Sequence, residues 1–286
     1  NRYQNQQEKS FDQLIEKIPA GSSQDFTYTH LFRTGGTGKH HQYPKSQTGY
    51  EYHKCTDLTA MIKDYIYNWQ KNNAHFDGIY SGFMTSSKQI ELFMDFLDVF
   101  YEENTMLLVD PVMGDDGRTY GIYSAALLDG MKALSRKADV ITPNLTEACL
   151  LADYDIEKVY SDTRKDVLLP LATEISEKLR SLSGKNQDVI ITGIKCRDDK
   201  APFIYNLVTT ANGTTTHRSH FFDVSFSGTG DLFASVICGS RLNGFSTEEA
   251  AERAGKFLYD SIADTMNDDT APNDGVNFEK FLRELM

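Results

Sequence analysis

Features that mark several classes of protein are missing from this sequence of 286 residues. No apolar run approaches the roughly 18 residues that cross a bilayer, so no membrane-spanning helix is expected. The chain opens on Asn1, and its first residues lack the charged and then apolar pattern of a secretory signal peptide. There is no internal repeat, no low-complexity tract and no linker rich in proline or glycine. A single domain over residues 1–286 is therefore the simplest interpretation.

Cysteine is also scarce, with four residues in the whole chain. Cys55, Cys149, Cys196 and Cys238 are widely scattered and form no CxxC pair. Zinc sites and thioredoxin-like redox motifs need such pairs, so neither is predicted. Reduced thiols in a cytoplasmic protein are the expectation.

An excess of basic residues is absent as well. Lys and Arg total 29 against 41 Asp and Glu, which gives a formal net charge of −12. A chain with this balance is a poor binder of nucleic acid and of anionic membranes, so neither is expected as a partner. Any phosphate must instead be bound through local backbone N–H groups, helix ends and a metal ion.

What the sequence does contain, from residue 57 onward, is an alternation of helical and strand patterns. Continuous apolar runs such as 106–109 suit central parallel strands that are covered by helices on both faces. Strand–helix alternation at this spacing predicts a three-layer α/β/α sandwich with a mostly parallel sheet. The expected strands are 78–82, 106–109, 139–142 and 189–192, with a hairpin of 203–209 and 214–217 around a type I′ turn at Asn212-Gly213. The expected helices are 58–69 with Asp57 as its cap, 90–100, 127–134, 175–182, 230–242, 247–266 and 278–286.

Residues 1–45 do not follow this alternation. A short amphipathic helix is possible over 11–18, and the stretch 33–39 superficially resembles a phosphate-binding loop. That loop requires Ser or Thr after its lysine and a buried strand before its first glycine. Lys39 is followed by His40, and residues 28–32 make a poor buried strand, so a surface loop is favoured.

Three polar motifs come at positions where ligands bind in an open α/β sheet, at the carboxyl ends of strands. Asp110 follows the strand that ends at Val109, and a carboxylate there can hold hydrated Mg²⁺ beside a phosphate. Asn144 and Glu147 lie three residues apart on one face of the next helix, where they can orient metal-bound water. Residues 228–231, Gly-Thr-Gly-Asp, open a later helix whose N-terminus favours a developing phosphoryl charge.

Each motif also has a purely structural interpretation. Asp-Pro after a strand is a common turn, Asn144 with Glu147 is close to a capping box, and Gly-x-Gly-Asp is itself a frequent turn. The order and spacing of all three in one α/β chain favour the functional interpretation.

These motifs resemble those of a known family. The segments DPVMGDDG, ITPNLTEACLL and FSGTGDLFASVICG, together with FDGIYSGFMTS, resemble the ribokinase-like superfamily and its vitamin B6 branch, the pyridoxal and pyridoxamine kinases. The resemblance extends from about residue 46 to the C-terminal region. It implies ATP-dependent phosphorylation of the 5′-hydroxymethyl group of a B6 vitamer (pyridoxal, pyridoxamine or pyridoxine) by a cytoplasmic homodimer.

The resemblance also implies a role for individual positions. Asp231 matches the general base, and Gly228, Thr229 and Gly230 match the anion hole around the transferred phosphoryl group. Residues 114–123 match a flap over the substrates. Asp110 and Glu147 match positions that contact Mg²⁺. The positions that contact ATP are Asp110, Asn144, Glu147, Thr142 and Thr192. Those that contact the vitamer ring are Thr48 and Phe83.

The start of the chain departs from this family. The family opens with an apolar strand and a polar, glycine-containing turn, and residues 1–45 contain no such unit. Three alternatives therefore remain: a hydroxymethylpyrimidine or phosphomethylpyrimidine kinase, a sugar kinase, or a non-catalytic vitamer-binding regulatory protein. The intact motif 228–231 argues against the last, because a protein that only binds has no need of a base beside an anion hole.

Overall fold

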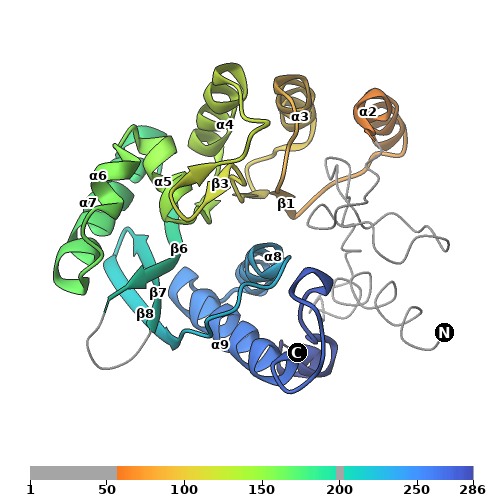
Figure 1. The fold of residues 1–286 in the computed structure, drawn as a ribbon. Helices are drawn as coiled ribbons and strands as arrows, with labels where there is room; N and C mark the ends of the chain where they lie inside the picture. The colour runs from red at the N-terminus through yellow and green to blue at the C-terminus, as the bar shows by residue number, and fades with distance from the viewer. Residues whose placement is uncertain (1–56, 198–202, 286) are drawn as a thin grey trace.

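A six-stranded sheet forms the centre of the computed structural model, which describes residues 57–197 and 203–285 (Figure 1). The strand order is β1-β2-β5-β6-β7-β8. The first four strands in this order are parallel, and the last two are antiparallel additions at one edge. The strands are β1 (Gly78–Ser81), β2 (Met106–Val109), β5 (Val140–Ile141), β6 (Asp188–Cys196), β7 (Phe203–Thr210) and β8 (Gly213–His220), and a separate hairpin joins β3 (Gly114–Asp115) to β4 (Arg118–Thr119).

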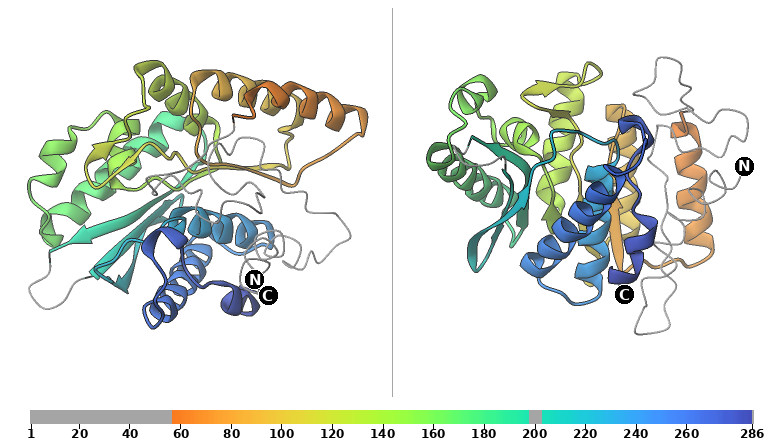
Figure 2. Two further views of the ribbon diagram at one scale, coloured as in Figure 1. Left: turned by 45° about the vertical axis from the view of Figure 1, so that its right-hand side comes forward. Right: turned by 60° about the horizontal axis from the view of Figure 1, so that its bottom comes forward.

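Helices cover both faces of the sheet, which confirms the three-layer sandwich (Figure 2). Leu107 and Val109 of β2 enter the core on one face while Leu108 enters the other, because successive side chains of a strand point to opposite sides. The helices of the larger core are α2 (Ile62–Lys71), α3 (Ser87–Phe100), α4 (Ala125–Lys137), α5 (Leu145–Ala152), α6 (Ile156–Tyr160) and α7 (Lys165–Ser183), and the exposed turn η1 (Thr59–Met61) leads into α2. The opposite face carries α8 (Thr229–Leu242), α9 (Thr247–Thr265), η2 (Pro272–Asp274) and η3 (Glu279–Leu285).

Most helices begin at a side chain that accepts a backbone N–H from their first turn. Ser86, Ser124, Asp155 and Ser246 do so at α3, α4, α6 and α9. Such caps satisfy donors that have no partner within the helix, and they fix where the helix starts. None of the described helices is long and apolar enough to cross a membrane.

Three local predictions differ from the structure. The hairpin loop between β7 and β8 is Ala211-Asn212, and the positive φ of +120° belongs to Gly213, so the type I′ turn at Asn212-Gly213 is wrong. The last segment is a 3₁₀ helix over Glu279–Leu285. Asp57 does accept the Thr59 N–H at 2.8 Å, but η1 begins one residue later than expected. The features predicted over residues 1–45, together with Thr48 and Cys55, lie outside the described residues.

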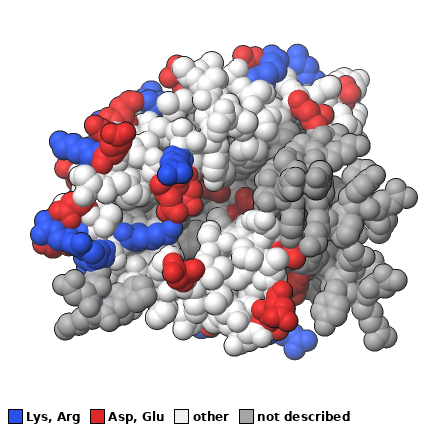
Figure 3. Space-filling view, in the orientation of Figure 1, with Lys and Arg blue, Asp and Glu red and all other residues white. Residues whose placement is uncertain are grey.

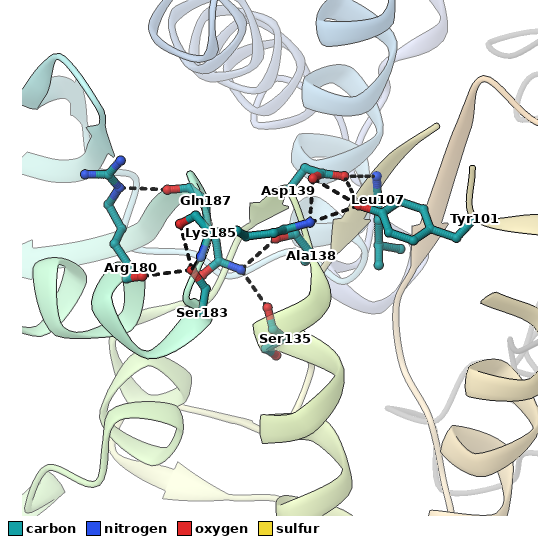
Figure 4. Close-up of polar contacts among 9 residues, drawn as sticks. All are labelled: Tyr101, Leu107, Ser135, Ala138, Asp139, Arg180, Ser183, Lys185 and Gln187. Atoms are coloured by element: carbon teal, nitrogen blue, oxygen red, sulfur yellow. Dashed lines mark hydrogen bonds and ion pairs between the residues drawn. The ribbon is translucent and has the colours of Figure 1, made fainter. Parts of the chain in front are cut away.

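Polar side chains join the strands at the amino edge of the sheet, opposite to the polar motifs (Figure 4). The Asp139 carboxylate accepts hydrogen bonds from Lys185 Nζ at 2.6 Å, from the Tyr101 hydroxyl at 2.9 Å and from the Leu107 N–H at 2.7 Å. Gln187 Nε2 donates to the carbonyl oxygens of Ser135 and Ala138. These contacts therefore connect β2, β5 and β6 at the ends where the three strands begin.

We expect Asp139→Ala to lower the free energy of unfolding by about 2 kcal/mol, because it leaves two donors and a cation without their acceptor. Urea denaturation of the variant would measure this, with Asp139→Asn as the control that keeps an acceptor for Leu107. Turnover should stay within twofold of the parent, because Asp139 lies at the edge away from the motifs. A large loss of turnover in a folded variant would contradict this separation.

Candidate active site

The three polar motifs meet at the carboxyl edge of the sheet. Asp110 follows β2, Asn144 follows β5 and caps α5, and Asp231 lies in the first turn of α8. Burial and the negative charge of Asp231 raise the pKa of Asp110, and burial and the charge of Asp110 raise the pKa of Glu147. Figure 3 shows acidic atoms in a hollow at the centre of one face of the molecule, between β3 and α8 of Figure 1.

Asp110 is almost fully buried, with 6% of its surface exposed. Its N–H donates to the Ser81 carbonyl oxygen at 2.8 Å, and its Oδ1 accepts the Thr142 hydroxyl at 3.1 Å. Burial and the nearby charge of Asp231 raise the pKa of Asp110 to about 7, although the Thr142 hydrogen bond opposes the shift. A carboxylate held in this way gains from a cation beside it, which is the environment of a metal or phosphate site.

Glu147 is equally buried and fastens the turn after β2 to α5. Its two carboxylate oxygens accept the N–H of Met113 at 2.9 Å and the N–H of Asn144 at 2.8 Å. Asn144 Oδ1 in turn accepts the Glu147 N–H, so the capping box suspected from the sequence is present. Burial and the charge of Asp110 raise the pKa of Glu147 well above its ordinary value, while these backbone donors lower it. Glu147 therefore has a defined structural role, and its contact with Mg²⁺ stays a prediction.

The predicted flap, residues 114–123, contains a small hairpin. Asp116 (φ +46°) and Gly117 (φ +78°) form the turn between β3 and β4. The Gly117 N–H donates to the Thr146 hydroxyl at 2.8 Å, and Lys195 Nζ of β6 lies 2.7 Å from Asp116 Oδ1. The Asp-Gly pair is a hairpin signal in the sequence. The sequence analysis predicts a flap over these residues but assigns no hairpin to Asp116-Gly117, so it missed this signal.

Gly114 is the position on which this hairpin depends. A Cβ atom at Gly114 would lie 2.3 Å from the Arg118 carbonyl oxygen and 2.8 Å from Thr119 Cα, both of them backbone atoms. We expect Gly114→Ala to separate β3 from β4 and to accelerate proteolysis within residues 114–119 severalfold. Gly121→Ala, whose Cβ would meet none of the described residues within 4 Å, is the control. Equal cleavage of the two variants would show that the hairpin tolerates the change.

The N-terminus of α8 differs from the capped helices because no side chain in the part of the chain that the structure describes caps it. Gly228 is its N-cap residue with φ +83°, a conformation that favours glycine. A Cβ atom at Gly228 or Gly230 would meet no atom of the described residues within 4 Å, so none of these residues covers either glycine. The Thr229 hydroxyl donates back to the Phe226 carbonyl oxygen at 3.2 Å. Backbone N–H groups beside open space at the start of a long helix can receive an anion.

Asp231 faces the carboxyl end of β1. Its Oδ1 lies 4.0 Å from the position that a Cβ atom would take on Gly82. Phe83, the predicted ring-packing residue, is the next residue along the chain and is half-buried. The structure thus brings Phe83 into the segment beside Asp231.

The remaining predicted residues lie along the next strands of the same edge. The register of β6 with β7 shifts between Ile191 and Ile194, and Thr192 there forms an isolated bridge with Asn144. Sequence reasoning assigned no individual role to Tyr120 or Tyr123 of the flap. Burial and the charges of Asp115, Glu147 and Asp110 raise the pKa of Tyr120 to about 12. Tyr123 donates its hydroxyl to the Val112 carbonyl oxygen at 2.6 Å.

Comparison with known proteins identifies the family. The profile of the phosphomethylpyrimidine kinase family matches residues 47–274. The chain belongs to this family. The matched range contains all three polar motifs and the predicted Thr48, which confirms that the sequence resemblance marks true kinship.

Solved structures in this family's fold include several kinases. A Bacteroides thetaiotaomicron protein assigned as a phosphomethylpyrimidine kinase, in a crystal form with pyridoxal, has a TM-score of 0.73 and 32% identity; the match covers 84% of this chain and 81% of that one. Pyridoxal kinase from Lactobacillus plantarum has a TM-score of 0.71 and 25% identity, with 84% and 81% covered. These neighbours confirm the ribokinase-like fold predicted from the sequence.

The curated proteins similar to this chain include kinases of B6 vitamers. A pyridoxine/pyridoxal/pyridoxamine kinase of Bordetella avium is 28% identical over 171 residues, which cover 58% of this chain and 52% of the relative. A pyridoxal kinase of Histophilus somni is 26% identical over 196 residues, which cover 67% and 64%. The chain thus spans between about half and two thirds of the curated relatives that it matches.

Proposed function

We propose that this protein transfers the terminal phosphoryl group of ATP to the 5′-hydroxymethyl group of a B6 vitamer (pyridoxal, pyridoxamine or pyridoxine). The observation that carries the proposal is the placement of Asp231 in the first turn of an uncapped, glycine-led helix, electrostatically coupled to the buried Asp110. Kinship with vitamer kinases and with a protein crystallised with pyridoxal supports this choice of acceptor.

In this proposal Asp231 accepts the proton of the acceptor hydroxyl while the oxygen attacks phosphorus. The N–H groups at the start of α8, over Gly228, Thr229 and Gly230, face the transferred group and stabilise its spread negative charge. Asn144, Thr142 and Thr192 lie along the same edge, on the side proposed for the nucleotide. Phe83 and Thr48 would hold the vitamer ring.

The donor chemistry fits Mg²⁺. Asp110 and Glu147 are buried carboxylates. Burial and the charge of Asp231 raise the pKa of Asp110, and burial and the charge of Asp110 raise the pKa of Glu147. Such hard oxygen ligands are those that Mg²⁺ prefers. Within residues 57–197 and 203–285, no group of three or more His, Cys, Asp or Glu side chains could hold a metal ion by itself. Asp110, with Glu147 behind it, would thus hold the ion together with phosphate oxygens and water. When bound, Mg²⁺ supplies positive charge to the phosphates.

The hairpin β3–β4 would exclude water. It is fastened to α5 and β6 through Thr146 and Lys195, beside the carboxylates. Closure over the substrates favours transfer to the alcohol over hydrolysis of ATP. A cytoplasmic homodimer, as the sequence resemblance implies, belongs to the same proposal.

A second candidate is a hydroxymethylpyrimidine or phosphomethylpyrimidine kinase, which the family match favours. Its acceptor is also a flat heteroaromatic alcohol, so the same residues would serve.

One assay separates these functions. The purified chain with Mg²⁺ and ATP is offered pyridoxal, pyridoxamine, pyridoxine, hydroxymethylpyrimidine and ribose, and both ADP and the phosphorylated product are measured. We expect product from at least one B6 vitamer at the highest kcat/KM. Preference for hydroxymethylpyrimidine would select the second candidate, and tight vitamer binding without ADP release would select a regulatory protein.

A further inference from the structure

β1 and the segment after it place Gly78, Tyr80 and Gly82 on one side, because alternate residues of a strand share a face. Ile79 belongs to the core beneath α3 and α4, whereas Tyr80 packs in the core beneath α8 and α9. The face that carries Tyr80 is therefore the one that meets α8 (Figure 1).

β1 and α8 run antiparallel, and a glycine at each end of β1 leaves room for the helix to pack against the strand. A Cβ atom at Gly78 would lie 2.6 Å from Leu242 Cδ1, at the last residue of α8. A Cβ atom at Gly82 would lie 4.0 Å from Asp231 Oδ1, in the first turn of α8. Tyr80 lies between the two glycines along the strand.

The hydroxyl of Tyr80 is directed toward the catalytic end of this stripe. It lies 3.6 Å from the Cβ position of Gly82, and its Cζ lies 3.9 Å from the same point. The phenol and the Asp231 carboxylate therefore both border the space directly above Gly82. Among the described residues, a methyl group on Gly82 would meet both at ordinary van der Waals distances.

We propose that the space above Gly82 receives the acceptor hydroxymethyl group and that the Tyr80 hydroxyl is a second polar contact to its oxygen. The inference rests on the proposed function and adds a residue to it. Tyr80 donates a hydrogen bond to one lone pair of the acceptor oxygen, which directs another lone pair toward phosphorus. The O–H proton passes to Asp231, the new O–P bond forms, and the bond from phosphorus to the ADP oxygen breaks.

The first test is Tyr80→Phe, which keeps the ring that packs between β1 and α8. We expect kcat/KM for the vitamer to fall about tenfold, the size expected for loss of one hydrogen bond. KM for ATP and the melting temperature should be unchanged. Tyr205→Phe is the matched control, because Tyr205 of β7 is a buried tyrosine whose hydroxyl has no hydrogen-bond partner among residues 57–197 and 203–285.

The second test is Gly82→Ala. Among the described residues the new methyl group makes only ordinary contacts, and Gly82 does not have a positive φ, so we expect the fold to be retained. Because the methyl group projects into the space proposed for the acceptor, kcat/KM for the vitamer should fall at least a hundredfold, while calorimetry should show unchanged ATP affinity. Gly255→Ala on α9, with its nearest contact at 3.8 Å, controls for adding a methyl group.

The outcomes separate this inference from the proposed function. Parent-like kcat/KM in folded Tyr80→Phe, or in folded Gly82→Ala, would overturn the inference while the function stands. A parent protein and a Tyr205→Phe control that phosphorylate no alcohol would overturn the function and the inference with it.

Discussion

Asp231→Asn is expected to lower kcat by about a thousandfold, within the roughly 10²–10⁴-fold range of general-base catalysis. Asparagine keeps the size of the side chain and loses the ability to take the acceptor proton. Because ATP would be held by the helix start and by residues of α5 and β6, its affinity should stay within about threefold of the parent. Rapid-quench kinetics with saturating vitamer would measure kcat, and calorimetry would measure ATP binding.

The control for this variant is Asp223→Asn, which removes an exposed carboxylate shortly before α8. It should turn over at the parent rate. If Asp231→Asn also turned over near the parent rate, Asp231 would not be the base, and the proton would need another acceptor.

Asp110→Asn is expected to have opposite effects on activity and on stability. Turnover should fall at least about a hundredfold, because the site loses a charge that would face Mg²⁺ and the phosphates. The protein without metal and nucleotide should be more stable than the parent at pH 8. The change removes a buried charge next to Asp231 and Glu147 and keeps an acceptor for the Thr142 hydroxyl.

The stabilisation should depend on pH in one direction. Folding raises the pKa of Asp110 from 3.8 to about 7, so the native state holds this proton more tightly than the unfolded state. The parent therefore loses stability as pH rises from about 4 to 7, and the loss is complete above that range. The advantage of Asp110→Asn should be small near pH 4 and reach roughly 2–4 kcal/mol at pH 8.

Thermal unfolding of the metal-free proteins between pH 4 and 8 would test this expectation, with exposed Asp77→Asn as the control. If the difference in stability between Asp110→Asn and the parent did not change with pH, folding would not raise the pKa of Asp110. Loss of stability at pH 8 would show that its charge is compensated in the free protein.

The sequence predicted the layers of the fold because local pattern and burial coincide there. The apolar run 106–109 became β2 with Leu107, Leu108 and Val109 fully buried. The turn after β7 was predicted less well, because Asn-Gly occurs there one position later than the loop itself. Strand register decides which residues form a turn, and register depends on pairing between strands rather than on the dipeptide.

The candidate site was predicted in part for the same reason. Because Asp110, Asn144 and Asp231 each come after a strand in the sequence, all three could be predicted to lie at the carboxyl edge of a parallel sheet. The use of Glu147 as a tie for the Met113 N–H could not be inferred, because it depends on a turn folding over α5. Likewise, the sequence shows Tyr80 only as one more residue of an apolar strand. The position of its hydroxyl beside Gly82 depends on how α8 packs against β1.

The contact between Gly78 and Leu242 restricts how this sequence can diverge. A side chain at residue 78 would collide with the end of a leucine that is 164 positions away in the chain. Homologous proteins that carry alanine or a larger residue at the position of Gly78 should therefore have a shorter residue at the position of Leu242. Divergence at these two positions should be correlated, with each lineage keeping a compatible pair so that the distance between Asp231 and the end of β1 is preserved.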